Sequence, residues 1–233
     1  MILRRLSPPG DPIDTTAPDA RDRIAELYPA PGLRVNLVAS VDGETADAAG
    51  TTAGLTAGAD RAVLGAIRSV SDTVLVGAAT LRAEPGLVPK STHLTVLTTT
   101  GDFSGAAVRD GIEEGRVLVV GPAAVEERAR ATFSAPFEFF AVDGDRAVPL
   151  GDMIAALHDR GFARIVCEGG PRLVGQLLAA GLVDELCLTT VPKLLGSPAV
   201  LFRGAITRPR DLELLQLLAD DGGALYARWR PLG

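Results

Sequence analysis

The sequence predicts an α/β protein whose mostly parallel mixed sheet is covered by helices on both faces. From Leu33 onward, short apolar segments of the strand type alternate with amphipathic segments of the helix type, an order typical of βαβ units. The 233 residues, 47% of them hydrophobic, suffice for one sizeable core. Strands expected at Leu212–Leu218 and Ala224–Trp229 follow one another without a helix, which predicts an antiparallel C-terminal edge.

The individual elements follow from the hydrophobic spacing, which alternates in strands and follows the helical turn in helices. Further strands are expected at Leu33–Ala39, Thr73–Gly77, His93–Thr98, Arg116–Val120, Phe137–Ala141, Arg164–Cys167 and Asp184–Val191. Helices are expected at Val63–Val70, from Ala78, at Ala123–Ala131, at Leu150–Leu157 and from Pro171. Thr56 or Asp60 is available to cap the first of these helices.

Two stretches fall outside this pattern. Residues 1–32 contain six prolines with polar residues between them, which predicts an irregular N-terminal arm with one or two helical turns around Arg21–Tyr28. The folded domain is therefore expected at residues 33–233. Residues 40–58 are rich in glycine, alanine and threonine, and a loop of this length in a compact domain is usually functional.

Charge and cysteine usage narrow the class of protein. The formal net charge is −6, and no basic stripe is present, so nucleic acid is not an expected partner. No apolar run reaches the roughly 18–20 residues needed to span a bilayer, so we expect no membrane span and a cytoplasmic location. Cys167 and Cys187 lie in apolar runs, as buried thiols do, and neither has metal-ligand spacing, so no metal site is expected.

Two strand-to-helix turns carry the chemical signal. In the first, Glu168-Gly169-Gly170-Pro171, glycines allow close approach of a ligand to the backbone, and Pro171 suits a first helical position. The second turn runs from Gly77 to Thr80, whose hydroxyl can donate to a phosphate or simply cap a helix. Each alone could be an ordinary turn. Two such turns at the carboxyl ends of sheet strands suit the pyrophosphate of a dinucleotide.

The motifs resemble a known family. The motifs on which the resemblance is based are, in chain order, Ser40-Val-Asp-Gly43, Gly77-Ala-Ala-Thr80 with Glu84-Pro85, Glu168-Gly-Gly-Pro171, Ala180-Gly-Leu-Val-Asp-Glu-Leu186 and Pro192-Lys-Leu-Leu-Gly196. From about Leu33 to the C-terminus, the chain resembles the reductase domain of the bifunctional riboflavin-biosynthesis deaminase/reductases and its stand-alone relatives. The resemblance implies a dihydrofolate reductase-like fold with three α/β/α layers, NADPH as cofactor and a small-molecule substrate.

The resemblance also implies residue roles. The cofactor would contact Val38, Ser40, Gly77, Thr80, Glu84, Gly169, Gly170, Pro171, Arg172 and Leu173, with the helix continuing to Gln176. Such folds meet the adenosine 2′-phosphate after the strand Leu94–Leu97, where the hydroxyls of Thr98, Thr99 and Thr100 favour NADP over NAD. The substrate would face Thr52, Arg68, Leu87 and Glu168.

The chain also departs from the family. It lacks the His-x-Glu and Pro-Cys-x-x-Cys signature of the zinc deaminase half, so deamination would need another protein. Asn36 stands where a lysine is frequent, Ala53-Gly54 where a bulky aromatic can stack on the cofactor, and Glu84 where aspartate is commoner. These changes weaken the assignment of one particular substrate.

Two carboxylates are catalytic candidates, since one near the acceptor nitrogen would favour hydride transfer to a C=N carbon. Glu168 ends a central strand, and its alternative role is a paired structural acid. Asp60 opens a helix where dihydrofolate reductases keep the acid that binds the pteridine, and its alternative role is an N-cap. Arg68 is either a solvated arginine or a clamp for a substrate phosphate or carboxylate.

These observations predict an NADPH-dependent oxidoreductase acting on a pyrimidine or pterin, with 5-amino-6-(5-phosphoribosylamino)uracil as the first candidate substrate. Dihydrofolate or another dihydropterin is the alternative substrate. A second alternative keeps the fold without catalysis, as an NADP-binding regulatory protein. A homodimer is expected because the apolar C-terminal strands would otherwise leave an uncovered edge.

Overall fold

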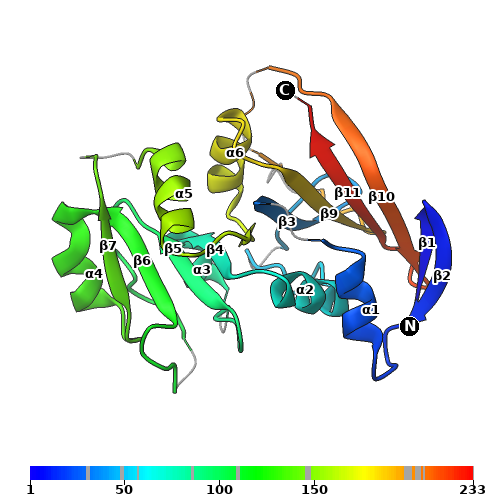
Figure 1. Cartoon of the computed structure of the whole chain (residues 1–233), viewed down its shortest axis with the longest axis horizontal. Helices are drawn as coiled ribbons and strands as arrows, with labels where there is room; N and C mark the ends of the chain where they lie inside the picture. Colours follow the sequence, from blue (N-terminus) through cyan, green and yellow to red (C-terminus); the bar gives the residue numbers. More distant parts are fainter. Residues whose placement is uncertain are drawn as a thin grey trace.

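The computed structural model describes the whole chain except residues 30–31, 48–49, 57, 85–86, 109–110, 145–147, 197–200, 203–205, 207 and 233. The described strands form one sheet (Figure 1) in the order β2-β1-β10-β11-β9-β3-β8-β4-β5-β6-β7. Their bounds are β1 Ile2–Ser7, β2 Pro9–Asp14, β3 Leu33–Ser40, β4 Thr73–Gly77, β5 His93–Leu97, β6 Val117–Pro122, β7 Glu138–Val142, β8 Ile165–Cys167, β9 Glu185–Val191, β10 Leu212–Asp220 and β11 Leu225–Pro231.

The seven strands from β9 to β7 run parallel, whereas β11, β10, β1 and β2 join them antiparallel. The helices are α1 Ala20–Glu26, α2 Asp60–Ser69, α3 Ala78–Ala83, α4 Glu126–Thr132, α5 Leu150–Asp159 and α6 Pro171–Ala179, with a 3-10 turn at Ala123–Val125 before α4. The expected single helix at Ala123–Ala131 is therefore divided between this 3-10 turn and α4.

Alternating strand residues supply two cores, one on each face of the sheet. In β4, Val74 and Val76 pack with residues of α1 to α4, whereas Leu75 packs on the other face with α5 and α6. Figure 1 shows α5 and α6 above the sheet and α1, α2 and α3 below it. The predicted α/β class, with a covered and mostly parallel mixed sheet in three layers, is confirmed.

The irregular arm expected for the N-terminus is wrong for residues 2–14. This segment forms the hairpin of β1 and β2, and β1 pairs with β10 from Leu3 to Ser7. Leu3 and Ile13 are buried in the core. The prolines obscured these strands, but a strand at the edge of a sheet tolerates proline because it leaves one row of amides unpaired. Consequently the C-terminal strands do not form the edge of the sheet; the hairpin covers them.

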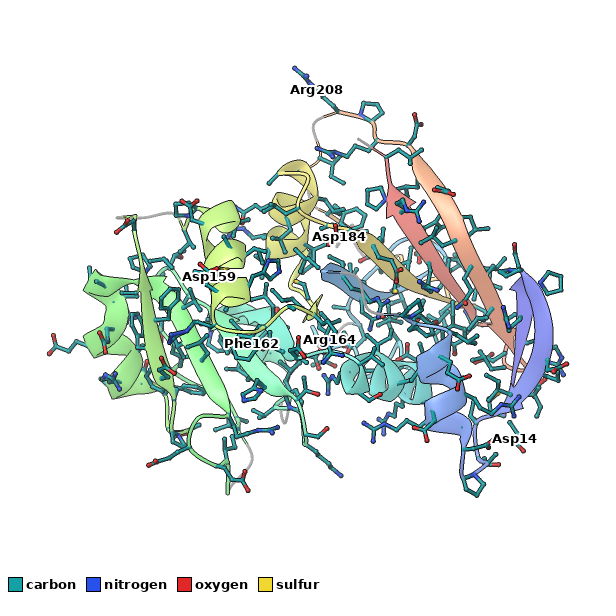
Figure 2. All side chains as sticks on the ribbon, viewed as in Figure 1. Asp14, Asp159, Phe162, Arg164, Asp184 and Arg208 are labelled. Atoms are coloured by element: carbon teal, nitrogen blue, oxygen red, sulfur yellow. The ribbon has the colours of Figure 1, made fainter. Side chains whose placement is uncertain are left out.

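The amino ends of the central strands are joined by ion pairs and backbone contacts. Arg164, just before β8, pairs with the carboxylate of Asp72 before β4, and the Asp184 carboxylate accepts from the Leu33 amide. Figure 2 labels Arg164 and Asp184 in this region. No helix within the described ranges is long and apolar enough to cross a membrane.

Candidate active site

The carboxyl ends of β3, β8 and β4 lie side by side in the middle of the sheet. The chain passes from β3 through α2 to β4 and returns later to insert β8 between them. The helices after β4 and β8 then lie on opposite faces, because α3 belongs to the α1–α4 face and α6 to the other. At such a reversal, α/β proteins bind ligands beyond the carboxyl ends of the strands.

The two predicted glycine turns are in direct contact at these strand ends. The amide of Gly77 donates to the carbonyl of Gly169 at 3.0 Å. Gly169 has a φ of +111°, a conformation that favours glycine, and the bond to Gly170 is cis. A Cβ on Gly170 would lie 2.8 Å from the Thr80 hydroxyl oxygen. The turns therefore form one cradle that a single added carbon would fill.

Helix α6 begins at this cradle. Pro171 is its first residue, as predicted, and Gly170 precedes it in an extended conformation. The amides of Arg172 and Leu173 lie in the first turn, where no helical carbonyl is available to them. The Arg172 side chain is exposed, whereas that of Leu173 is buried in the core. Leu173 can therefore offer only its backbone to a ligand.

Glu168 is held by Arg68. The arginine donates from Nε to Oε1 at 2.7 Å and from Nη2 to Oε2 at 2.5 Å, so the pair is bidentate. The carboxylate side chain is 8% exposed and the guanidinium 22%. The structure thus joins two residues predicted to face the substrate. Arg68 is not a solvated arginine, and its fork is already occupied in this arrangement.

Asp60 is the first residue of α2, the helix that also carries Arg68, and is 8% exposed. Burial raises its pKa to about 6, a hydrogen bond with Thr189 of β9 opposes this, and the charge of Glu168 adds to the increase. Asp60 is not the N-cap of α2, because Ala59 holds that position, and Ala59 has no side chain that could cap the helix. A carboxyl group that titrates near neutrality can take up or release a proton during a reaction.

The long loop after β3 is tied to the site by its polar residues. Glu84 accepts the amide of Thr52 at 2.7 Å, so a predicted cofactor residue and a predicted substrate residue are neighbours. The Ser40 hydroxyl donates to Asp42 and accepts from the amide of Glu44. The carboxylate of Asp42 in turn accepts amides of the segment after β9. Ser40 and Glu84 thus have internal partners that a ligand would have to share.

Other predicted residues differ in their access to a ligand. Val38 and Leu87 are half-buried against the core on the α1–α4 face. Thr98 is buried, and its hydroxyl accepts the amides of Thr100 and Gly101. Thr99 is exposed at the same turn. Thr99 is therefore better placed than Thr98 to meet a phosphate.

Two neighbours of Asp60 escaped the sequence interpretation. Thr189 reaches it from β9, and Asp220 acts on it from the end of β10. Both are far from residue 60 in the chain, and no local pattern connects them. The only signal was Asp220-Asp221-Gly222-Gly223, which reads as a hairpin turn and does not reveal a carboxylate directed at a helix.

Solved structures share this architecture over nearly the whole chain. A pyrimidine reductase-like protein from Corynebacterium diphtheriae matches 94% of this chain and 96% of its own, with a TM-score of 0.67 and 22% identity. The deaminase/reductase of Thermotoga maritima matches 90% of this chain and 60% of its own, with a TM-score of 0.71 and 21% identity. The chain therefore has the same fold as these two proteins.

Sequence comparisons define the family. Residues 31–226 match the RibD C-terminal domain family, so the chain belongs to it. The 2,5-diamino-6-ribosylamino-4(3H)-pyrimidinone 5′-phosphate reductase of Archaeoglobus fulgidus is 28% identical over 85% of this chain and 98% of its own length. The riboflavin biosynthesis protein RibD of Escherichia coli is 31% identical, over 82% of this chain and 54% of that protein. The predicted family is confirmed, and the protein is an oxidoreductase.

Proposed function

We propose that this protein is an NADPH-dependent reductase of a phosphorylated ribosylaminopyrimidine in riboflavin biosynthesis. The observation that carries the proposal is the contact between the Gly77–Thr80 and Gly169–Gly170 turns beside Asp60 and Glu168. The likeness to the archaeal pyrimidinone phosphate reductase adds support, because it extends over 98% of that protein.

The residues of the cradle fit a dinucleotide. Gly170 leaves room beside the Thr80 hydroxyl that any side chain would take. The first-turn amides of Arg172 and Leu173 are suited to phosphate oxygens, and the start of α6 adds its positive dipole end. When bound, NADPH would supply the hydride.

The loop after β5 supports NADPH over NADH. Arg82 of α3 donates from Nη1 to the carbonyl of Asp102, and Arg128 of α4 donates to its carboxylate at 3.0 Å. Together, the two arginines and Asp102 carry a net charge of +1. This charge lies beside the exposed Thr99, where it would attract the 2′-phosphate of NADPH. Replacement of Arg82 with Ala should weaken NADPH binding more than NADH binding; equal losses for both cofactors would contradict this role.

The substrate side of the site supplies a proton and a polar edge. The Asp60 carboxyl group, buried and titrating near neutrality, would give a proton to the acceptor nitrogen and favour iminium character at the neighbouring carbon. The Arg68–Glu168 pair walls the site and keeps its geometry fixed. Asn36 lies on the same face of β3 as Val38, and its side chain makes no hydrogen bond with another described residue, so the side-chain amide is available to a pyrimidine edge.

The direct test is NADPH oxidation by the purified protein with three substrates: the ribosylaminopyrimidinone 5′-phosphate with its 2-amino group, the corresponding uracil, and dihydrofolate. We expect turnover with one or both pyrimidines. Turnover confined to dihydrofolate would favour the pterin alternative. Tight NADPH binding without turnover on any of the three would favour the regulatory alternative, and absence of NADPH binding would contradict the proposal altogether.

A homodimer is also proposed, now through the sheet face rather than the edge. Leu212, Leu214 and Leu225 are 42%, 39% and 40% exposed, and their cross-strand partners are Pro231, Trp229 and Ala219. Directly paired residues share a face, so these leucines make an apolar surface on β10 and β11. Such a surface is self-complementary across a two-fold axis. Light scattering should give a dimer that Leu214→Asp with Leu225→Asp dissociates, and Leu6→Asp on β1 serves as the control.

A further inference from the structure

The carboxylate of Asp220, at the end of β10, is fully enclosed by donors. Its Oδ2 accepts the amide of Ala59 at 2.9 Å and the hydroxyl of Tyr226 at 2.7 Å. Its Oδ1 accepts the amides of Gly222 at 2.8 Å and Ala224 at 3.1 Å. The residue is only 6% exposed. With two donors on each oxygen, this carboxylate has a structural task and is not a ligand for substrate.

That task is to cap helix α2 from a distant part of the chain. The N-cap residue of α2, Ala59, has no side chain that could accept an amide. Asp220 accepts the Ala59 amide across a separation of 161 residues. Gly58, with a φ of +58°, makes room for it, since a Cβ there would lie 1.9 Å from Oδ2. The turn between β10 and β11 thus fixes where α2 begins.

The position of α2 determines two contacts of the site at once. Asp60 is its first residue and faces Thr189 of β9, and Arg68 in its last turn holds Glu168, which directly follows β8. Both contacts run from one rigid helix to two different strands. A displacement of the helix start would therefore change the surroundings of Asp60 first and the Arg68 pair second.

We propose that Asp220 is a positioning residue for the reduction: it anchors the start of α2 so that Asp60 faces Thr189 and Arg68 faces Glu168. The inference rests on the proposed function, in which Asp60 handles the proton. Tyr226 of β11 supports Asp220 through its hydroxyl, so the anchor spans the whole hairpin at the C-terminal end of the chain.

The effect of Asp220 on Asp60 can be measured, because the charged groups around Asp60 determine its pKa. Glu168 and Asp220 both raise the pKa of Asp60 by their negative charge, whereas Arg61 on the same helix and the bond with Thr189 lower it. Tyr226 faces the same group from β11 and stays protonated, because burial and the nearby Asp220 raise its pKa. Removal of the Asp220 charge should thus lower the pKa of Asp60, an effect that a purely structural acid elsewhere would not produce.

The test compares Asp220→Asn with Asp221→Asn, its exposed neighbour in the same turn. An asparagine amide cannot accept on both sides, so two of the four donors lose their partner. We expect kcat to fall by about ten- to a hundred-fold for Asp220→Asn, with NADPH affinity retained, because a slightly misplaced catalytic group has that effect. The alkaline limb of the pH–kcat profile, where Asp60 loses the proton that it donates, should move to lower pH. Asp221→Asn, whose carboxylate accepts from Arg4 and from the Ile2 amide, should leave both kcat and the pH profile unchanged.

Two measurements judge the anchor independently of turnover. Carboxyl NMR titration should show a lower pKa for Asp60 in Asp220→Asn, and hydrogen exchange should show faster amides at the start of α2. If wild type reduces none of the substrates, the proposed function fails while these two readouts still decide the anchor. If Asp220→Asn does not fold, Tyr226→Phe removes one donor from Asp220 but keeps its charge, so it should speed amide exchange at the start of α2 without lowering the pKa of Asp60. An unchanged Asp60 titration together with unchanged exchange in the folded variant overturns the inference.

Discussion

At the scale of single residues, three buried acids show how partners assign roles. Asp220 has four donors, Glu168 has a bidentate arginine, and Asp60 has one threonine hydroxyl. Burial raises the pKa of Asp60, which has the fewest of these partners, toward neutrality, whereas the four donors hold the pKa of Asp220 below its usual range. The sequence nominated Glu168 and Asp60 as catalytic, but residue type could not rank them, since the ranking depends on the donors that folding brings to each carboxylate.

The raised pKa of Asp60 predicts a pH-dependent cost to stability. The folded chain binds this proton more tightly than the unfolded chain, whose aspartate titrates near its model value of 3.8, so stability is lost as pH rises from there to about 6. Asp60→Asn should therefore raise the free energy of unfolding by about 1–3 kcal/mol at about pH 8 and by little at about pH 3. Denaturant unfolding at the two pH values measures this, and an equal effect at both would show that Asp60 titrates normally.

Glu168→Gln should separate turnover from cofactor binding. The variant removes the charge that holds Arg68 but leaves the backbone of Gly169 and Gly170 in place. We expect kcat to fall at least about ten-fold while the Kd for NADPH changes less than about three-fold. Arg68→Lys keeps the positive charge and loses the bidentate fork, so an intermediate kcat is expected. Unchanged turnover in Glu168→Gln would leave this acid with a structural role only.

At the scale of elements, the site depends on how tightly neighbouring turns approach one another. The glycine motif was recognisable in the sequence, and so was the helix start at Pro171. The contact of Gly170 with the Thr80 hydroxyl was not, because it joins segments ninety residues apart whose spacing only the sheet order defines. Because β8 and β4 are parallel neighbours in the sheet, the turns that follow them lie side by side. Two motifs that each gave a weak signal in the sequence therefore form one cradle.

Gly170→Ala tests that cradle. The added Cβ lies 2.8 Å from the Thr80 hydroxyl oxygen, so Thr80 must move and the space for phosphate shrinks. We expect NADPH affinity to fall about ten-fold or more, which corresponds to about 1.4 kcal/mol of binding free energy. Gly151→Ala in α5, where a Cβ meets nothing within 4 Å, is the matched control and should bind NADPH like wild type. Calorimetric titration gives both constants, and equal affinities would contradict the cradle.

At the scale of the whole molecule, the N-terminal hairpin closes one side of the sheet. It covers β10 and contributes Leu3 and Ile13 to the core, so the former edge of the antiparallel half is internal. The expectation of a dimer through a free C-terminal edge loses its basis here, because the chain covers that edge itself. The exposed leucines on the face of β10 and β11 are the remaining reason to expect association.

A pair of substitutions on β1 measures what the hairpin contributes. Leu3 is 0% exposed and packs in the core, whereas Leu6 on the same strand is 49% exposed. Leu3→Ala should cost about 2–5 kcal/mol of unfolding free energy, as buried leucines do. Leu6→Ala should stay within about 0.5 kcal/mol. Chemical denaturation of both variants checks this, and similar small effects would mean that the hairpin is not integrated in the cooperative fold.

The sequence by itself determined the α/β class, the family, the glycine turns and the acids Glu168 and Asp60. These depend on local patterns of hydrophobic spacing and on residues adjacent in the chain. Tertiary structure alone decided that Arg68 holds Glu168, that Asp60 meets Thr189, and that Asp220 caps α2. The physical reason is that pKa values, caps and ion pairs depend on distance in space. In this sheet, strands as far apart in sequence as Thr73 of β4 and Ile165 of β8 are nearest neighbours, and their order cannot be read from local periodicity.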